Sequence, residues 1–285
     1  MNDAHNTSAS PAPSSWAEFP PPGETPAALT LATKPKGGPV WLELASLPLL
    51  LLLWQVVALI AQSRFLPGPV PVAAEIWSLA WEGRLLDDFS ATLSRALIGF
   101  VTAMVIGTTL GIALGRMAWA DRLFTPWVAV GLNMPAIVIG MICYIWLGLS
   151  DFALVLAVVI NKVPLVATMM REGVRALSAD YDELAATFRM PRARYLRLVL
   201  VPQLMPHLLA AARAGLSLVW KMVLVFEVLG SDGGVGFRVG LYFQLFDMAG
   251  ILAYTCCFIA VVLTMEYGVL RPIEGRVLRW RKDLT

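Results

Sequence analysis

Cysteine and charge are both scarce in this chain of 285 residues. Its three cysteines, Cys143, Cys256 and Cys257, lie in apolar runs without a Cys-x-x-Cys or Cys/His spacing, which excludes disulfide and zinc frameworks. Charged residues make up 15% of the chain and hydrophobic residues 58%, whereas soluble domains have about 25% charged and roughly 45–50% apolar residues. The composition therefore argues against a soluble enzyme.

Neither sign of charge dominates, because 22 Lys and Arg oppose 20 Asp and Glu for a formal net charge of +2. No bulk field exists to attract nucleic acid, so we expect no nucleic-acid partner. The sequence has no Gly-x-x-x-x-Gly-Lys-Ser/Thr loop, without which the chain cannot cradle nucleotide phosphates by that route. His207 is a single histidine at a predicted membrane boundary and does not make a metal site. We expect no cofactor and no metal bound by this chain.

The two ends of the chain differ from its apolar body. Residues 1–40 hold 8 of the 19 prolines, and such a composition cannot bury enough apolar surface to offset chain entropy. We predict a disordered, cytoplasmic tail there and a basic cytoplasmic tail over residues 271–285. A signal peptide is not expected, since nothing basic opens the chain and the first apolar run begins only near Trp41.

Long apolar runs occupy the body of the chain. A bilayer core about 30 Å thick needs roughly 20 helical residues, and six stretches qualify. We therefore predict an all-α integral membrane protein with about six transmembrane helices, the first helix with its outer segment at 41–87 and the core at 88–270. The six stretches are Ala45–Ser63, Ala96–Gly115, Leu123–Ser150, Phe152–Met170, Leu208–Gly230 and Met248–Met265.

The distribution of basic residues predicts the orientation. Six spans place both termini on one side of the membrane. With both termini in the cytoplasm, the inner segments carry fifteen Lys and Arg and the outer segments carry three, Arg64, Arg84 and Arg238. Inner loops are enriched in Lys and Arg, so we predict that both termini are cytoplasmic.

Small residues recur every four positions in the second predicted span and share one face of it. Such a stripe lets another helix approach closely. Two interpretations stay open, namely packing within one subunit and a subunit interface. The residues are Gly99, Ala103, Gly107, Gly111 and Gly115.

The segment between the fourth and fifth spans is long and charged. Apolar residues at positions 181, 184, 185 and 188 follow helical spacing, which predicts an amphipathic helix. Met190 precedes Pro191 and is pushed toward extended backbone, so this helix should stop near Arg189 and a second short helix should begin at Pro191. The helix pair, at 178–202, either lies on the membrane surface with arginines facing lipid phosphates or docks a soluble partner.

This segment resembles the cytoplasmic signature of ABC importer permeases: Glu-Ala-Ala, three residues, Gly, nine residues, Ile, one residue, Leu-Pro. The matching positions are Glu183, Ala185, Ala186, Val199, Val201 and Pro202, while Leu184 and Arg189 replace the first Ala and the Gly. The resemblance is to the nitrate/sulfonate/taurine type and covers roughly Leu66–Arg281. It is also carried by Leu66-Pro67-Gly68-Pro69, Leu93-Ser94-Arg95, Gly107 to Gly115, Asn133-Met134-Pro135, Glu227-Val228-Leu229-Gly230 and Gly233-Gly234-Val235-Gly236-Phe237.

The resemblance implies a type I ABC importer transmembrane fold in the bacterial inner membrane. It implies a non-catalytic permease for a small anionic solute, paired with a second permease protomer, two copies of an ABC ATPase that bind ATP and Mg, and an extracytoplasmic solute-binding protein. The helix pair would insert into a cleft of the ATPase. The coupling residues would be Tyr181, Glu183, Ala185, Ala186, Phe188, Arg189 and Pro202.

Charges inside the predicted spans need an explanation, because an ionisable group at mid-bilayer costs about 2.5–3.5 kcal/mol. Arg213, Ser217 and Lys221 are spaced i, i+4 and i+8 and form one polar stripe. One interpretation is that the translocation route is lined by this stripe and by Lys162, Glu227, Asn133 and Tyr144. The alternative pairs the lysines with Glu227 on another helix or with the partner protomer, and gives Asn133 and Tyr144 interhelical hydrogen bonds.

An ion-coupled secondary transporter is the other functional class that the sequence allows. Such a protein relays protons or binds sodium through acidic residues in its spans, and here the one acidic group well inside a span is Glu227. A membrane-embedded enzyme is not favoured, since no Ser/His, His/Glu or paired Asp constellation lies at membrane depth.

Overall fold

The computed structural model describes residues 40–177, 183, 185, 187–270, 272 and 275. Every regular element in these residues is helical, which confirms the all-α class. The predicted proline-rich tail, apart from Val40, and most of the predicted basic tail lie outside the described residues. The chain divides into two units between Leu53 and Trp54, and each is described by itself.

The helix α1 (Val40–Ala61) begins in the first unit and ends in the second. Its apolar part, Pro48–Ala61, is shorter than a membrane span of 18 residues. In the second unit, Trp54 Nε1 donates a hydrogen bond to the carbonyl of Pro67 at 3.1 Å. This bond closes the connection to α2 (Pro69–Trp81), which begins with proline, the residue whose fixed φ suits a first helical turn.

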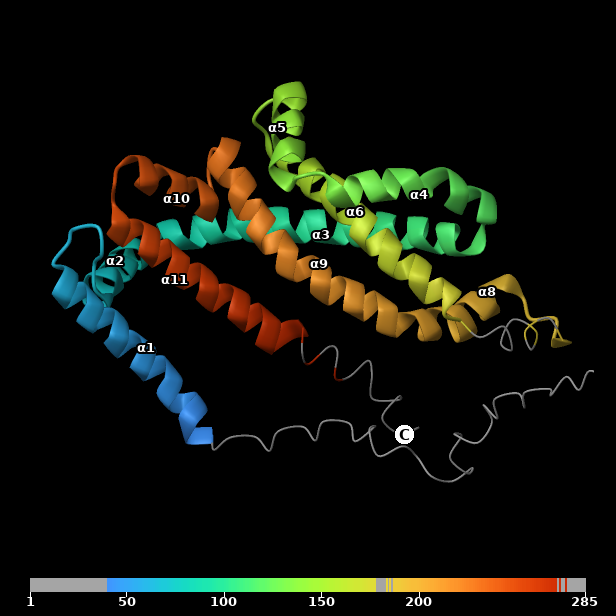
Figure 1. Cartoon of the computed structure of the whole chain (residues 1–285), viewed down its shortest axis with the longest axis horizontal. Coiled ribbons are helices and arrows are strands. Elements are labelled where there is room, and N and C mark those ends of the chain that lie inside the picture. The colour runs from blue at the N-terminus through green and yellow to red at the C-terminus, as the bar shows by residue number, and fades with distance from the viewer. Residues whose placement is uncertain are drawn as a thin grey trace, which may run out of the picture. The chain divides into compact units, whose positions relative to one another are not determined.

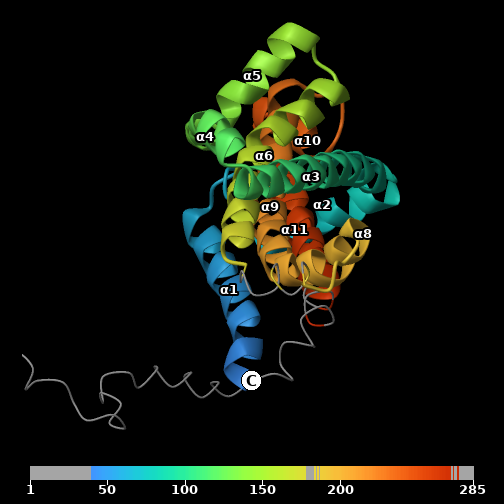
Figure 2. The ribbon, with the colours of Figure 1, turned by 90° about the vertical axis from the view of Figure 1, so that its right-hand side faces the viewer.

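Four helices in the described residues are long and apolar enough to cross a membrane. Figures 1 and 2 show them crossing one another in the second unit. They confirm four of the predicted spans. They are α3 (Arg84–Arg116), α6 (Asp151–Arg175), the helix Ala193–Gly230 made of α8 (Arg192–Tyr195), η2 (Leu196–Leu200) and α9 (Val201–Gly230), and α11 (Met248–Met265) with η3 (Glu266–Leu270).

The predicted third span, Leu123–Ser150, is not one straight helix. It consists of α4 (Ala118–Asn133) and α5 (Ala136–Leu147), which are bent by 98° at the break. Met134 is extended there, with ψ of 128°, because the proline ring disfavours helical backbone in the residue before it. Pro135 also has ψ of 128°, outside the helical range. If the bent pair counts as one span, the described residues contain five spans, whereas hydropathy alone predicts six.

The small-residue stripe of α3 packs against α6 of the same chain. A Cβ added at Gly107 would lie 2.6 Å from Val166 Cβ, and one added at Gly115 would lie 2.6 Å from Val174 Cβ. Gly99 and Gly111 face α6 in the same way. Of the two interpretations of this stripe, packing within one subunit is therefore the one that the structure shows.

The core of the second unit lies where α3, α5, α6 and α9 meet. Val158, Val219, Val223 and Phe226 have no exposed surface there. A short helix, α10 (Val235–Gln244), follows α9 and packs against it and against α11. These contacts fix one face of α9 in the core and leave the opposite face to carry the polar stripe.

Candidate functional site

The polar stripe on α9 is exposed in the single chain. Arg213, Ser217 and Lys221 are all exposed, as expected from their i, i+4, i+8 spacing, because residues at this spacing share one helix face. The opposite face carries Ala211, Gly215, Val219 and Val223, which are buried. We call Arg213, Ser217 and Lys221 the α9 stripe.

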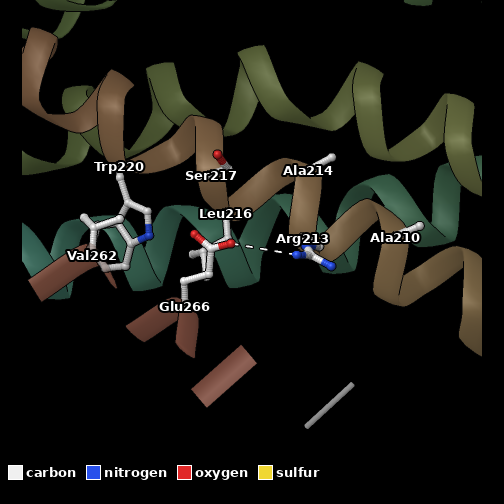
Figure 3. A pocket seen from close by; sticks show the side chains of 8 residues that line it. All are labelled: Ala210, Arg213, Ala214, Leu216, Ser217, Trp220, Val262 and Glu266. Carbon is white, nitrogen blue, oxygen red and sulfur yellow. Dashed lines mark ion pairs between the residues drawn. The ribbon is translucent and has the colours of Figure 1, made fainter. Parts of the chain in front are cut away.

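A cavity of about 510 Å³ is lined by Arg213 and Ser217 of the α9 stripe, whereas Lys221 is not among its lining residues. Figure 3 shows Arg213 reaching toward Glu266 of η3 across this cavity, with Trp220 and Val262 at one end. The Arg213 and Glu266 side chains form an ion pair at 3.8 Å. Both are substantially exposed, at 50% and 39%, so solvent screens the pair and leaves it weak. The lining residues are Ala210, Arg213, Ala214, Leu216, Ser217, Trp220, Val262 and Glu266.

The structure separates the other predicted pathway residues from this stripe. Lys162 is 5% exposed and Glu227 is 0% exposed, and side chains so enclosed do not line a route in this conformation. Tyr144 is also buried and donates to the carbonyl of Phe226 at 2.9 Å, an interhelical hydrogen bond. Asn133 is exposed and donates to the carbonyl of Ala129 in its own helix at 2.8 Å.

Glu227 belongs to a buried ion-pair cluster that the sequence analysis did not predict. Its Oε1 accepts a hydrogen bond from Arg95 NH1 at 2.9 Å, and both of its oxygens lie 2.9 Å from Thr92 Oγ1. The predicted alternative of a pair between Glu227 and Lys162 or Lys221 is therefore wrong within the chain. The Arg95 cluster comprises Asp88, Thr92, Arg95, Glu227, Arg238 and Tyr254.

The Arg95 cluster ties α3 to four other helices. The NH2 group of Arg95 pairs with Asp151 at the start of α6 at 2.7 Å. Asp88 accepts from Arg238 of α10 at 2.9 Å and from the Tyr254 hydroxyl of α11 at 2.7 Å. Burial lowers the pKa of Arg238, but its hydrogen bond with Asp88 and the charge of that carboxylate raise it more, so its pKa lies above the ordinary value.

The cluster also caps the first turn of α10. The backbone N–H of Val235 donates to Thr92 Oγ1 at 2.9 Å, and that of Gly236 donates to Glu227 Oε2 at 2.8 Å. These N–H groups have no partner inside their own helix, and an anion at a helix N-terminus is stabilised by the helix dipole. Glu227 thus has a structural role in this chain.

The sequence contained part of the signal for this cluster. Asp88, Thr92 and Arg95 follow i, i+4, i+7 spacing, which places them on one face of α3. Arg95 and Glu227 also stand in runs that carry the family resemblance. Their pairing was missed because 132 positions separate them and because Arg95 directly precedes the charge-free run that begins at Ala96.

The predicted coupling helix is described only in part. Glu183 and Phe188 are exposed, the latter at 71%, while Ala185 is 9% exposed. Tyr181 and Ala186 lie outside the described residues. The described residues at and around the end of this helix thus include four of the predicted coupling residues, of which Glu183, Phe188 and Arg189 are exposed and Ala185 is buried.

The first coupling helix ends where the sequence predicted. Arg189 has φ of +46°, and the N–H of Met190 donates to the carbonyl of Ala185 at 2.9 Å. A hydrogen bond from residue i+5 to residue i, with the residue before the donor in the left-handed conformation, is the Schellman motif that ends many helices. Glycine is the usual residue at the left-handed position. Arg189 therefore adopts the left-handed conformation itself, at a cost of roughly 1–2 kcal/mol, although Pro191 was expected to supply the break.

The second short helix differs from the prediction, because it runs without interruption into α9. Residues Ala193–Gly230 form one helix, with a π-helical turn at Leu196–Leu200 in which the N–H of Val201 donates to the carbonyl of Leu196. Pro202 follows directly and has no N–H, so regular helical bonding is lost at this point in any case. The π-helical turn accommodates the missing N–H of Pro202, so the helix continues past the proline.

Comparison with known proteins places the chain in one family. Residues 103–269 match the family described as the binding-protein-dependent transport system inner membrane component. The chain is 23% identical over 246 residues to the putative aliphatic sulfonates transport permease protein SsuC of Bacillus subtilis, covering 85% of this chain and 89% of that protein. It is also 23% identical over 252 residues to the taurine transport system permease protein TauC of Escherichia coli, covering 86% and 91%.

The fold is also found in a solved transporter. An inward-facing structure of the MetNI methionine ABC transporter aligns with a TM-score of 0.61 at 18% sequence identity. The alignment covers 70% of this chain and 98% of that chain. The likeness shows a shared transmembrane fold.

Proposed function

The chain belongs to the family of binding-protein-dependent transport system inner membrane components, and from this premise we propose that its α9 stripe lines the route of a small anionic solute. The protein is a multi-pass permease subunit of an ABC importer in the bacterial inner membrane.

One observation carries the proposal, namely the exposure of Lys221 in an apolar helix. Lys221 lies nine residues before Gly230, the end of α9, which is about 14 Å at 1.5 Å per residue. That depth is close to the middle of a bilayer core about 30 Å thick. A lysine facing lipid at this depth costs about 2.5–3.5 kcal/mol, so we infer that this face of α9 meets water and a second permease protomer.

The charge of Lys221 is available to a solute. No carboxylate in the described part of the chain lies within ion-pair distance of Lys221, in contrast to Arg213, which pairs with Glu266. A cation without a fixed partner attracts an anion. This favours a sulfonate, nitrate or carboxylate over a cation as the transported species.

Energy is supplied by a separate subunit in this proposal. Two ATPase copies, with ATP and Mg, receive the coupling helices of two permeases, and Glu183, Phe188 and Arg189 are exposed residues that contact them. A solute-binding protein delivers the solute at the opposite face. The burial of Glu227 between Arg95 and Thr92 disfavours the ion-coupled alternative, since its one candidate carboxylate has structural partners.

Uptake by the reconstituted complex tests the route. Permease, ATPase and binding protein are placed in vesicles, and Lys221→Ala is compared with Lys221→Arg. We expect the alanine variant to lose uptake while the permease dimer still assembles, and the arginine variant to retain uptake because the charge remains. Failure of Lys221→Ala to assemble would instead show that the lysine is structural.

Copurification tests the coupling contact. The tagged permease is solubilised mildly, and the ATPase that accompanies it is quantified for Glu183→Lys and for Asp87→Lys, a carboxylate on the distant first turn of α3. We expect the ATPase to be lost only from the Glu183 variant. Equal recovery from both variants would contradict docking at the coupling helix.

A further inference from the structure

Two contacts join the α3–α4 turn to the two helices that flank the coupling segment. The turn, Arg116–Thr125, closes α3 and opens α4. The coupling segment, residues 176–191, leaves the end of α6 and enters α8. The turn contacts the last residues of α6 on one side and Tyr195 of α8 on the other, so it is bonded to the helix before the segment and to the helix after it.

The first contact is an ion-pair group at the end of α6. Asp121 Oδ2 accepts from Arg175 NH2 at 2.6 Å, and Asp121 Oδ1 lies 3.4 Å from Arg171 NH1. Thr125 Oγ1 accepts from Arg171 at 3.1 Å and donates to Asp121 at 3.1 Å. The Asp121 and Arg171 side chains are only 20% and 17% exposed, so solvent screens this group less than a surface pair.

The second contact is at the start of the long helix that contains α9. Arg116 NH2 donates to the Tyr195 hydroxyl at 2.7 Å, and the guanidinium carbon lies 5.3 Å from the centre of the Tyr195 ring. Tyr195 directly precedes the π-helical turn. A displacement of this end of the helix therefore also acts on Arg116 of the α3–α4 turn.

The ends of α3 and α6 do not depend on these contacts for their packing. Gly115 already lies against Val174, close enough that a Cβ would be 2.6 Å from the Val174 side chain. Val174, Leu200 and Leu204 belong to an apolar cluster, with Leu177 and Tyr195 packed against it. The charged contacts are thus additional to an apolar core that holds the helix ends together.

We propose that Asp121 and Arg116 are positioning residues that pass motion of the coupling segment to α3 and α4. The proposal rests on the proposed function, since it requires an ATPase at the coupling segment. The α3–α4 turn moves with the segment because it is bonded to α6 just before the segment and to α8 just after it. The bent pair of α4 and α5 is then driven from its α4 end, in step with α9.

The test measures solute transported per ATP hydrolysed. Complexes containing Asp121→Asn, Tyr195→Phe and Asp121→Glu are reconstituted in vesicles with ATPase and binding protein, and Asp87→Asn serves as the matched control. We expect Asp121→Asn and Tyr195→Phe to lower the ratio about fivefold or more, the lower end of coupling between sites, with copurified ATPase unchanged. Asp121→Glu restores the carboxylate and should recover most of the ratio.

The outcomes separate this proposal from the proposed function. An unchanged ratio in both Asp121→Asn and Tyr195→Phe overturns the positioning role while leaving the docking of the ATPase intact. If Asp121→Asn does not assemble, Tyr195→Phe decides by the same ratio, since it removes one hydroxyl and keeps the ring. Retention of ATPase by Glu183→Lys, in contrast, overturns the proposed coupling contact itself.

Discussion

The Arg95 cluster and the α9 stripe both place charge in apolar helices, and they differ in how that charge is satisfied. In the cluster, Glu227 has no exposed surface and accepts hydrogen bonds from Arg95, Thr92 and the Gly236 backbone. In the stripe, Lys221 is exposed and has no ion-pair partner in the described residues. A charge with internal partners stabilises the fold, whereas an exposed one at membrane depth requires something outside the chain.

This difference matters because hydropathy treats both groups alike. Removing one partner of a buried pair leaves the other charge uncompensated, whereas removing an exposed charge leaves nothing unsatisfied in the chain. Stability and transport should therefore respond in opposite ways to substitutions in the two regions.

The largest loss of stability is expected from Glu227→Ala. The variant leaves Arg95 without its most buried partner and uncaps the first turn of α10, so we expect a loss of about 3–5 kcal/mol in unfolding free energy. Thermal unfolding in detergent measures it, and Val228→Ala, at an exposed neighbour, is the control. Equal melting temperatures for both variants would show that Glu227 does not stabilise the fold.

A smaller effect is expected from Tyr254→Phe. The tyrosine hydroxyl donates to Asp88 Oδ2 at 2.7 Å in a buried setting, and a hydrogen bond to a charged group is worth about 1.5–3 kcal/mol. The ring and its stacking on Phe89 remain. The same melting measurement should show a smaller loss of stability than Glu227→Ala does. A larger loss would show that the bonds of Asp88 contribute more to the stability of the cluster than those of Glu227.

The smallest effect on stability is expected from Lys221→Ala. An exposed side chain without an internal partner contributes within about 0.5 kcal/mol, so the melting temperature of the solubilised permease should stay near that of the parent. Uptake by the same variant should nevertheless be lost. A drop in stability as large as that of Tyr254→Phe would show that the stripe and the cluster do not differ as described.

The spans could be predicted where a long apolar run is also a straight helix. α3, α6, α9 and α11 were found in this way, because lipid requires that a spanning segment satisfy its own backbone. The bend between α4 and α5 was missed, since the run from Leu123 to Ser150 is apolar on average and a hydropathy sum does not register backbone angles. The end of the first coupling helix at Arg189 was predicted correctly. Arg189 adopts the left-handed backbone conformation there, although glycine is the usual residue in that conformation.

Partners distant in sequence could not be predicted. The α3 stripe indicated that some helix approaches closely, yet spacing along one helix does not identify the other. Likewise Glu227 was recognised as needing a partner, and the lysines were considered because they lie in predicted spans. Arg95 is the partner because the α3–α9 packing brings its side chain to Glu227, and that packing is a property of the folded chain.

Thiol accessibility along α9 tests the central claim most directly. In a complex whose three native cysteines are replaced by alanine, Ser217→Cys on the stripe and Val223→Cys on the buried face are exposed to a charged, water-soluble thiol reagent. The account predicts that Ser217→Cys reacts in the assembled, membrane-embedded complex and Val223→Cys does not. An unreactive Ser217→Cys would show that lipid or protein covers the stripe, and would contradict a water-filled route along α9.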